Sequence, residues 1–341
     1  MRTITTKHYL AAAAFCMLAC VAVAYYFFFT GFLRGGETAE LYIDSDDTAD
    51  SVYVKLDTLA KGAPLCAFRT LANHYDYDRR LHTGHYVLEP GETAIDVFKK
   101  LKNAQQTPVM LTVPPTRTMP RMAKALSQRL MLDSATIASA LLDSAYCAQI
   151  GYTTATVPAL FIPNTYEVYW NMSIDRLMDR MKKEHDAYWT KERKQKAEAI
   201  GLTAVEVATL ASIIDEETAN DGEKPMIAGM YLNRLHKGML LQADPTVKFA
   251  LQDFGLRRIL NKHLTADSPY NTYRYVGLPP GPIRVASTVA MDAVLNPADH
   301  DYLYMCAKED FSGTHNFART LSEHMANARR YQQALNQRGI K

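Results

Sequence analysis

Three consecutive carboxylates, Asp215, Glu216 and Glu217, close an apolar helical pattern in this chain of 341 residues. On a helix, residues three, four and seven positions apart share a face, so Glu217 stacks over Ile214 and Leu210 while Glu216 points toward the polar side. A carboxyl at the end of an apolar stripe is partly desolvated, which raises its pKa and lets it keep a proton near neutral pH. Glu217 is therefore a candidate general acid. The same residues also fit the solvated acidic last turn of an amphipathic helix.

The helix that would position Glu217 has clear ends in the sequence. Thr203 and Glu206 form a Thr-x-x-Glu capping box, and residues 220–222 supply a polar stop that contains glycine. We therefore expect a helix over residues 203–218, with Glu217 in its last turn.

Other elements follow from periodicity and turn residues. Residues 109–113 predict a strand that enters a larger domain, and Pro225 and Gly238 delimit a helix as the usual start and stop residues. The expected fold class is α+β. The helices are expected over residues 119–131, 134–144, 173–199, 203–218 and 225–237.

Residues 9–33 contain no charged side chain and are long enough to cross a bilayer, which takes about 20 residues. Arg2 and Lys7 precede them, and such a short basic leader stays in the cytoplasm by the positive-inside rule. A cleaved signal peptide is the alternative, but its apolar core is normally about 7 to 15 residues long. We expect a cytoplasmic tail over 1–8, a retained transmembrane helix over 9–33, and an extracytoplasmic body from Arg34 onward.

A small segment over residues 34–106 separates the apolar span from a larger domain over 107–341. Its clearest part is a short strand that turns at Pro90 and Gly91 into a helix capped by Thr93. This strand, turn and helix resemble the LysM peptidoglycan-binding module, which implies a glycan-binding subdomain. A spacer that does not grip sugar fits the same residues.

The composition argues against several other function classes. The formal charge is +2 and no basic face carries interleaved aromatic residues, so the sequence does not indicate nucleic acid as a partner. No His-x-x-x-His or Cys-x-x-Cys grouping predicts a metal site, and His82 and His85 lack a third ligand. Neither a Walker phosphate loop nor a Gly-x-Ser-x-Gly turn occurs. We expect neither a metal nor a cofactor.

Several motifs follow one another in order through the larger domain. They are Phe161-Ile-Pro-Asn-Thr-Tyr166, Ala211-Ser-Ile-Ile-Asp-Glu-Glu-Thr218, Tyr231-Leu-Asn-Arg-Leu235, Leu241-Gln-Ala-Asp-Pro-Thr-Val247, Tyr270-Asn-Thr-Tyr273, Gly277-Leu-Pro-Pro-Gly-Pro-Ile283, Asn296-Pro297, Tyr302-Leu-Tyr304 and His315-Asn-Phe317. Their order and spacing resemble those of the endolytic murein transglycosylases, the MltG or YceG-like family. The catalytic acid of that family is the second Glu of a Ser-Ile-Ile-Glu-x-Glu-Thr pattern, which falls on Glu217. The first acid of the pattern is Asp215 here, which leaves the role of position 215 open.

The resemblance implies a lyase, a lytic transglycosylase that cuts MurNAc-β-1,4-GlcNAc bonds within peptidoglycan strands and leaves 1,6-anhydro-MurNAc ends. Protonated Glu217 would donate to the bond oxygen, and its carboxylate would then take the proton of the sugar's own C6 hydroxyl. The implied role is to end the growth of nascent strands at the inner membrane, with the catalytic domain in the periplasm. The implied partners are peptidoglycan strands, the membrane and cell-wall synthases.

Polar and aromatic residues of the matching motifs are expected to position sugars around Glu217. They are Asn233, Gln242, Asp244, Tyr270 and Asn271. Each could equally cap a helix or satisfy a loop. His315 is open in the same way, as a structural histidine beside aromatic residues or as a member of the site. Among the neighbouring acids, Asp215 is expected to act on Glu217 through its charge, and removal of the Glu216 charge is expected to have almost no effect.

Two rival functions use the same residues differently. A two-carboxylate muramidase would pair Glu217 with Asp244 or Asp221, because hydrolases that use water as nucleophile usually need two acids at a defined separation. A non-enzymatic scaffold of the cell-wall machinery would bind glycan without cutting it. The products released from peptidoglycan distinguish all three functions.

Overall fold

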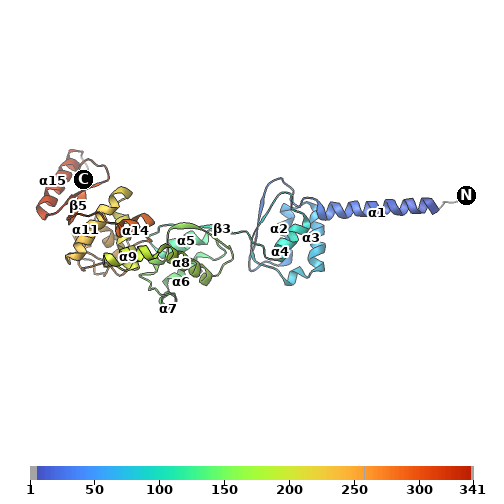
Figure 1. The fold of residues 1–341 in the computed structure, drawn as a ribbon, viewed down its shortest axis with the longest axis horizontal. Helices are drawn as coiled ribbons and strands as arrows, with labels where there is room; N and C mark the ends of the chain where they lie inside the picture. Colours follow the sequence, from blue (N-terminus) through green and yellow to red (C-terminus); the bar gives the residue numbers. More distant parts are fainter. Residues whose placement is uncertain (1–5, 257, 339–341) are drawn as a thin grey trace. The chain divides into compact units, whose positions relative to one another are not determined.

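A computed structural model describes residues 6–256 and 258–338, which fold into two compact units. The first unit contains the described residues up to 111 and two short returns of the chain, 129–131 and 167–172. The second unit consists of the remaining stretches, which are 112–128, 132–166 and the described residues from 173 onward. Figure 1 traces the chain from α1 to α15 through both units.

Helix α1 (Thr6–Phe29) is apolar along its length and contains no buried residue. Its 24 residues span about 36 Å at the usual rise of about 1.5 Å per residue, which exceeds the roughly 30 Å hydrocarbon core of a bilayer. Among the described residues, α1 is the one unbroken helix that is long and apolar enough to cross a membrane.

The apolar sequence continues beyond α1, but its last part belongs to the first unit. Phe32 and Leu33 are 0% and 4% exposed within the core of that unit. The backbone N–H of Phe32 donates to the carbonyl of Glu92 at 2.7 Å, which ties this segment to the rest of the unit. The helix therefore ends at Phe29 rather than at residue 33, because hydropathy alone does not separate lipid-facing from core-facing residues.

Short strands and helices make up the rest of the first unit. In chain order they are β1 (Ala39–Ile43), α2 (Ala49–Leu59), α3 (Gly62–His74), η1 (Tyr77–Arg79), β2 (Gly84–Leu88) and α4 (Ala94–Lys102). β1 and β2 pair antiparallel, with Leu41 opposite Tyr86, and both of these side chains are buried. Phe68 of α3 is fully buried in the same core, 5.9 Å from the ring of Phe98 of α4.

The strand and helix predicted on either side of Pro90 and Gly91 are confirmed as β2 and α4. Thr93 caps α4 reciprocally: its Oγ1 accepts from the N–H of Asp96 at 3.3 Å, and Asp96 Oδ2 accepts from the N–H of Thr93 at 3.0 Å. Gly91 has a φ of +92°, a conformation that favours glycine and lets the chain turn there. The likeness to a LysM module stays a prediction.

The strand predicted over residues 109–113 is confirmed as β3 (Val109–Val113). It pairs with β4 (Asn164–Val168) in a two-stranded sheet, and its side chains alternate between buried and exposed. The boundary between the two units falls within both strands.

Helices dominate the second unit, and a small hairpin lies near its C-terminal end. In chain order the elements are α5 (Met119–Ser127), α6 (Ser134–Leu142), α7 (Ser144–Gln149), η2 (Val157–Leu160), α8 (Ile174–Tyr188), α9 (Lys191–Ala199), α10 (Ala204–Glu217), η3 (Asp221–Glu223), α11 (Lys224–His236), α12 (Asp244–Ala250), α13 (Asn261–Leu264), α14 (Thr288–Leu295), β5 (Tyr304–Ala307), β6 (His315–Ala318) and α15 (Leu321–Gln337). β5 and β6 pair antiparallel, with Met305 opposite Phe317. The mixed α+β class is confirmed.

The single helix predicted over residues 173–199 is wrong, because the structure has two helices there. α8 ends at Tyr188, and Thr190 caps α9 by accepting from the N–H of Arg193 at 3.3 Å. The segment contains neither glycine nor proline, so its charged helical pattern carries no visible break.

Helix α10 is central to the core of the second unit. Every residue from Val207 to Ile214 is buried, and α10 packs against α11, α12 and α14. The helices predicted over residues 203–218 and 225–237 are confirmed as α10 and α11. The packing of the buried α10 therefore sets the position of the carboxylates in its last turn.

Candidate active site

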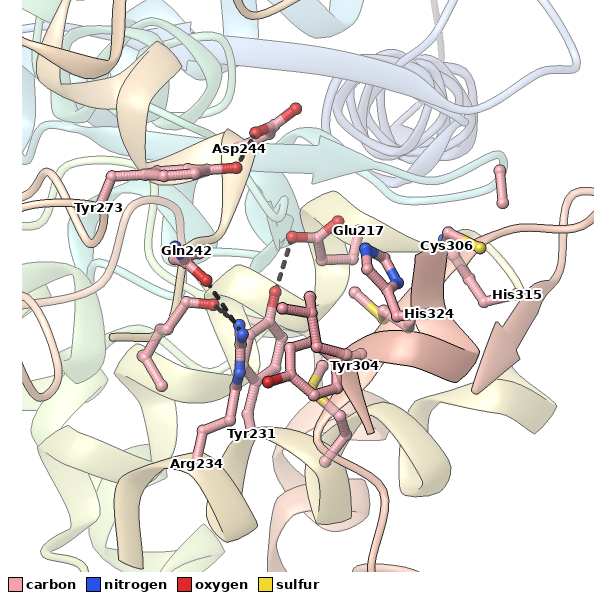
Figure 2. A pocket seen from close by; sticks show the side chains of 15 residues that line it. Glu217, Tyr231, Arg234, Gln242, Asp244, Tyr273, Tyr304, Cys306, His315 and His324 are labelled. Carbon is pink, nitrogen blue, oxygen red and sulfur yellow. Dashed lines mark hydrogen bonds between the residues drawn. The ribbon is translucent and has the colours of Figure 1, made fainter. Parts of the chain in front are cut away.

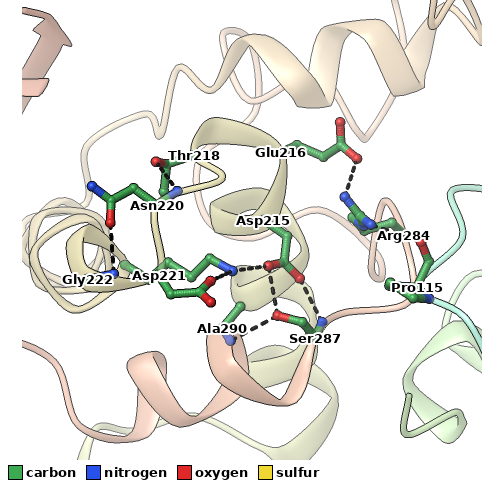
Figure 3. A network of polar contacts seen from close by, with 11 residues as sticks. Pro115, Asp215, Glu216, Thr218, Asn220, Asp221, Gly222, Arg284, Ser287 and Ala290 are labelled. Atoms are coloured by element: carbon green, nitrogen blue, oxygen red, sulfur yellow. Dashed lines mark hydrogen bonds and ion pairs between the residues drawn. The ribbon is translucent and has the colours of Figure 1, made fainter. Parts of the chain in front are cut away.

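The last turn of α10 carries its three carboxylates out of the core in different directions. The helix begins at the predicted capping box, in which Glu206 Oε2 accepts from the N–H of Thr203 at 2.8 Å. Figure 3 shows Asp215 and Glu216 turned toward different partners. Glu217 instead faces a cavity.

The Glu217 carboxyl is half-buried and its pKa is raised to about 7. Burial is the main cause, because desolvation disfavours the charged form, and the negative charge of Asp244 acts in the same direction. The hydroxyl of Tyr231 opposes this effect by donating to Glu217 Oε1 at 2.8 Å, and the charges of His315 and Lys248 also lower the pKa. A carboxyl with such a pKa retains its proton far closer to neutral pH than an exposed glutamate does, which suits a general acid.

The cavity beside Glu217 has a volume of about 470 Å³. Figure 2 looks into it. Its other lining residues are Met230, Tyr231, Arg234, Leu241, Gln242, Asp244, Tyr273, Tyr304, Met305, Cys306, Ala307, His315, Leu321 and His324. Such a volume is typical of ligand sites, and the polar and aromatic side chains provide hydrogen bonds and flat surfaces of the kind that sugars need. Among residues 6–256 and 258–338, no group of three or more His, Cys, Asp or Glu side chains is placed to hold a metal ion.

A second carboxylate, Asp244, lies on the rim of this cavity as the first residue of α12. Its Oδ1 accepts a hydrogen bond from the hydroxyl of Tyr273 at 2.6 Å. Burial is the main cause that raises the pKa of Tyr273, and the bond to Asp244 acts in the same direction, so this hydroxyl stays protonated. Asp244 is thereby held beside Glu217 with one oxygen occupied.

Arg234 of α11 holds two neighbouring residues of the cavity lining through two hydrogen bonds. Its Nη1 donates to the carbonyl of Leu241 at 2.6 Å, and its Nη2 donates to Gln242 Oε1 at 3.0 Å. Gln242 has a φ of +53°, an uncommon conformation for a residue with a side chain. The N–H of Gln242 donates to the carbonyl of Thr272 at 3.1 Å. Hydrogen bonds therefore hold both the side chain and the backbone of this strained residue.

His315 reaches the cavity from the first position of β6. Its Nδ1 lies 2.8 Å from Oε2 of the buried Glu223, and its backbone N–H donates to Glu223 Oε1 at 2.6 Å. The histidine therefore has a buried carboxylate partner and also lines the site.

Asp215 does not line the cavity and instead ties α10 to the start of α14. Its side chain is 6% exposed and accepts from Lys224 Nζ at 2.8 Å and from the N–H and hydroxyl of Ser287 at 2.7 and 2.8 Å. Ser287 is the N-cap of α14. Figure 3 shows this network. Lys224 balances the charge of Asp215, so the main role of this carboxylate is to hold α10 against the start of α14.

The expectation that Glu216 points toward the polar side is wrong. Its side chain is 12% exposed and forms a bidentate pair with Arg117, with bonds of 2.8 and 2.7 Å. Arg284 Nη1 donates to the same carboxylate at 2.8 Å. The direction of Glu216 does not follow from its position on α10 alone, because the two arginines come from segments far away in the sequence.

The structure brings Gln242 and Asp244 of the predicted sugar-binding residues to the cavity, but not the other three. Asn233 Nδ2 donates to the carbonyl of His300 at 2.6 Å and so secures a loop. Asn271 is fully buried and donates to the carbonyl of Ala266 at 2.8 Å. Tyr270 packs against a phenylalanine ring, with 4.6 Å between ring centroids. A role in sugar binding stays a prediction for all three residues.

Several of the residues that line the cavity were not predicted from the sequence. They are Tyr231, Arg234, Tyr273, Tyr304 and His324. The first four lie inside the quoted motifs, and Tyr231 and Arg234 share a helical face at a spacing of three. That spacing could have identified the pair. His324 lies outside every motif, on α15.

Comparison with known proteins adds an independent result. The chain is similar to an endolytic murein transglycosylase of Bacillus subtilis (strain 168), with 36% identity over 166 residues that cover 49% of this chain and 45% of the relative. It is also similar to an endolytic murein transglycosylase of Streptococcus pneumoniae serotype 2 (strain D39), with 26% identity over 264 residues, 67% of this chain and 46% of the relative. The chain thus spans about half the length of the curated relatives it matches.

A solved structure and a family match cover more of the chain. The fold is similar to the crystal structure of a yceG-like protein from Listeria monocytogenes, with a TM-score of 0.56 and 26% identity, covering 86% of this chain and 99% of that chain. The YceG-like family matches residues 41–330. Because this match takes in most of the chain, including α10 and every lining residue of the cavity, the chain belongs to the YceG-like family.

Proposed function

We propose that this chain is a lytic transglycosylase that cuts MurNAc-β-1,4-GlcNAc bonds inside peptidoglycan strands. The observation that carries the proposal is Glu217, whose pKa is raised to about 7 beside a cavity of about 470 Å³. The relatives from B. subtilis and S. pneumoniae, both named endolytic murein transglycosylases, support the substrate class and the reaction.

Glu217 supplies the proton on which bond cleavage depends. Tyr231 holds Oε1, so Oε2 carries the proton toward the oxygen that joins the two sugars. As the bond from C1 to this oxygen breaks, the oxygen takes the proton, and the C6 hydroxyl of the same MurNAc bonds to C1 and loses its own proton to a base. In the simplest scheme the base is the Glu217 carboxylate just formed.

The substrate itself is the nucleophile in this scheme, so one protein carboxyl suffices. Ordinary retaining or inverting hydrolases usually need two carboxyl groups at a defined separation. The product of the lyase is a 1,6-anhydro-MurNAc end, and no water is consumed. Gln242, Asp244 and the tyrosines of the cavity would hold the sugars on either side of the bond.

A two-carboxylate muramidase is the second candidate, and the position of Asp244 favours it over the remaining alternatives. Asp244 lines the same cavity as Glu217 and could activate a water molecule. Asp221 is a poor second acid, because its side chain is 64% exposed and pairs with Lys224 at 2.7 Å. A glycan-binding scaffold without activity is the third candidate.

Mass analysis of released fragments separates these candidates. Purified full-length protein in detergent would be incubated with intact peptidoglycan sacculi, and the soluble products analysed by mass spectrometry. We expect fragments with anhydro ends. Reducing ends instead would indicate the muramidase, and absence of release, with Glu217→Gln as the matched control, would indicate the scaffold.

The proposed location is the inner membrane, with α1 as a single-pass anchor and both units in the periplasm. The apolar α1 and the basic leader Arg2 and Lys7 support this orientation. Protease added to spheroplasts should digest the protein beyond Arg34 and leave cytoplasmic control proteins intact. Protection of that body under the same conditions would contradict the orientation.

An anchored enzyme of this kind would act where new strands are made. We infer that it ends the elongation of nascent strands beside cell-wall synthases, because α1 would keep the catalytic unit attached to the membrane. Depletion of the protein should lengthen newly made strands and so lower their fraction of anhydro ends. An unchanged fraction would argue against this role.

The first unit is proposed to bind glycan in the manner of a LysM module. A binding module raises the local concentration of substrate without entering the chemistry. Removal of residues 37–106 should therefore weaken activity on intact sacculi more than on short soluble strands. The deletion also removes most of the core that packs around Phe32. Equal losses of activity on both substrates would therefore indicate that the first unit stabilises the fold.

A further inference from the structure

The cavity is lined by a histidine, His315, that the simplest scheme leaves unused, and a buried acid outside the lining, Glu223, binds this histidine. Glu223 in η3 has an 8% exposed side chain, and both of its oxygens bind His315. Oε1 accepts from the backbone N–H of His315 at 2.6 Å, and Oε2 lies 2.8 Å from His315 Nδ1. Figure 2 shows His315 among the side chains that line the cavity together with Glu217.

The carboxylate fixes the place of the proton on the imidazole ring. A carboxylate only accepts hydrogen bonds, so Nδ1 is the donor and Nε2 keeps a lone pair in the neutral ring. Among the residues that the structure describes, no protein group forms a hydrogen bond with Nε2 of His315. A histidine oriented by a buried acid, with its second nitrogen available, has the arrangement of a general base.

The surroundings of His315 place it within electrostatic reach of the acid. Titratable or charged groups line the cavity from every neighbouring element: Glu217 of α10, Arg234 of α11, Asp244 of α12, Cys306 of β5 and His324 of α15, with tyrosine hydroxyls at positions 231, 273 and 304. In its protonated form, His315 lowers the pKa of Glu217 through its charge. Both residues line the same cavity.

We propose that His315 is the base of the reaction, and that its Nε2 takes the proton of the C6 hydroxyl while Glu217 gives its proton to the leaving oxygen. This inference rests on the proposed function and replaces the Glu217 carboxylate in the second half of that scheme. Glu223 is a positioning residue, because it acts through His315.

The protons balance over one turnover. The bond from C1 to the leaving oxygen breaks, the bond from O6 to C1 forms, and no group is oxidised or reduced. The sugar gains one proton at the leaving oxygen and loses one at O6, while Glu217 loses a proton and His315 gains one. Transfer of a proton from His315 to Glu217 through water restores both residues.

The decisive variant is His315→Asn. The asparagine amide stands near the place of Nδ1 and can still donate to Glu223, but it has no counterpart of Nε2. We expect an unchanged melting temperature and a fall in kcat for anhydro products on the order of 10² to 10⁴-fold, the usual contribution of general acid-base catalysis. His236→Asn, the same change at an exposed histidine outside the cavity, is the matched control and should keep full activity.

The pH profile separates a base from a structural residue. If His315 is the base, the wild-type profile of kcat/KM has an acid limb where the imidazole becomes protonated, and His315→Asn lacks that limb. Glu223→Gln keeps its size and an acceptor for the backbone N–H, but its amide group favours the other imidazole tautomer, in which Nε2 carries the proton. We expect this variant to lose at least about 10-fold in kcat through the same step.

The outcomes that overturn the inference are distinct from those that overturn the proposed function. A wild-type profile without an acid limb, or a His315→Asn enzyme of normal rate, would leave Glu217 as both acid and base. A uniform loss at all pH values, or a lowered melting temperature in both variants, would make His315 a structural tie for β6. Failure of the wild-type protein to make anhydro ends would instead refute the proposed function itself.

Discussion

The hydroxyl of Tyr231 donates a hydrogen bond to Glu217 Oε1 at 2.8 Å, from a side chain that is 1% exposed. Burial raises the pKa of Tyr231 well above its ordinary value, so the hydroxyl remains a donor throughout the neutral range. One oxygen of Glu217 is therefore fixed against α11, and the acid can turn only its other oxygen toward a substrate.

Tyr231→Phe should shift the pH profile of the enzyme upward. The hydrogen bond lowers the pKa of Glu217, so its loss raises that pKa further above about 7 and keeps the acid protonated to higher pH. We expect the alkaline limb of kcat/KM to move by roughly 1 pH unit, which corresponds to one hydrogen bond of about 1.4 kcal/mol. Tyr302→Phe, outside the cavity lining, is the control. An alkaline limb that stays in place would show that this bond does not tune the acid.

Glu217 should also make stability depend on pH. Its pKa is raised from 4.5 to about 7 in the folded protein, so the unfolded chain binds fewer protons between these values and stability falls as pH rises through them. Glu217→Gln removes this loss. The free energy of unfolding of the variant, relative to that of the wild type, should therefore rise by about 2 to 3 kcal/mol from pH 4.5 to pH 8. Urea unfolding of both proteins at both pH values measures this change. A constant difference across this range would contradict the raised pKa.

Lys224→Met should destabilise the second unit strongly. The change leaves the buried Asp215 carboxylate with Ser287 but without a positive partner, and breaking such a pair costs about 3 to 5 kcal/mol. Asp221→Asn is the matched control, because it removes the exposed partner of the same lysine and should cost at most about 1 kcal/mol. Chemical denaturation of both variants measures these losses in the free energy of unfolding. Equal small losses would mean that Asp215 does not tie α10 to α14.

Glu216→Gln should affect stability rather than catalysis. The amide cannot pair with both Arg117 and Arg284, so we expect a loss of about 1 to 3 kcal/mol in the free energy of unfolding. Activity measured well below the melting temperature should stay near the wild-type level, because Glu216 does not line the cavity. Glu192→Gln, in an exposed pair with Lys196, is the control and should leave the melting temperature unchanged. A large loss of rate in the folded Glu216 variant would give this residue a part in the chemistry.

Local signals made α10 and α11 predictable from the sequence. Thr203 and Glu206 cap α10 as their spacing predicts, and Gly238, with a φ of +62°, follows the end of α11. The place of Glu217 in the last turn of α10 was also predictable, because Thr203 and residues 220–222 delimit the helix. The break at Thr190 was not, since a threonine cap leaves the polar pattern of the segment intact.

Contacts between distant segments explain what the sequence could not predict. Glu216 meets Arg117 and Arg284 only because α10, the segment after β3 and the loop before α14 converge. His324 joins the cavity only through the packing of α15 on the hairpin. Such pairings leave no periodic signal in the sequence, because the partners are tens of residues apart or more.

The most direct test of this account is the rate of anhydro-muropeptide formation by purified Glu217→Gln protein on intact sacculi. The amide keeps the size of the side chain and can still accept from Tyr231, but it cannot donate a proton to the leaving oxygen. We expect the rate to fall by on the order of 10² to 10⁴-fold at a melting temperature no lower than that of the wild type. A folded Glu217→Gln enzyme with the wild-type rate would contradict the assignment of Glu217 as the general acid.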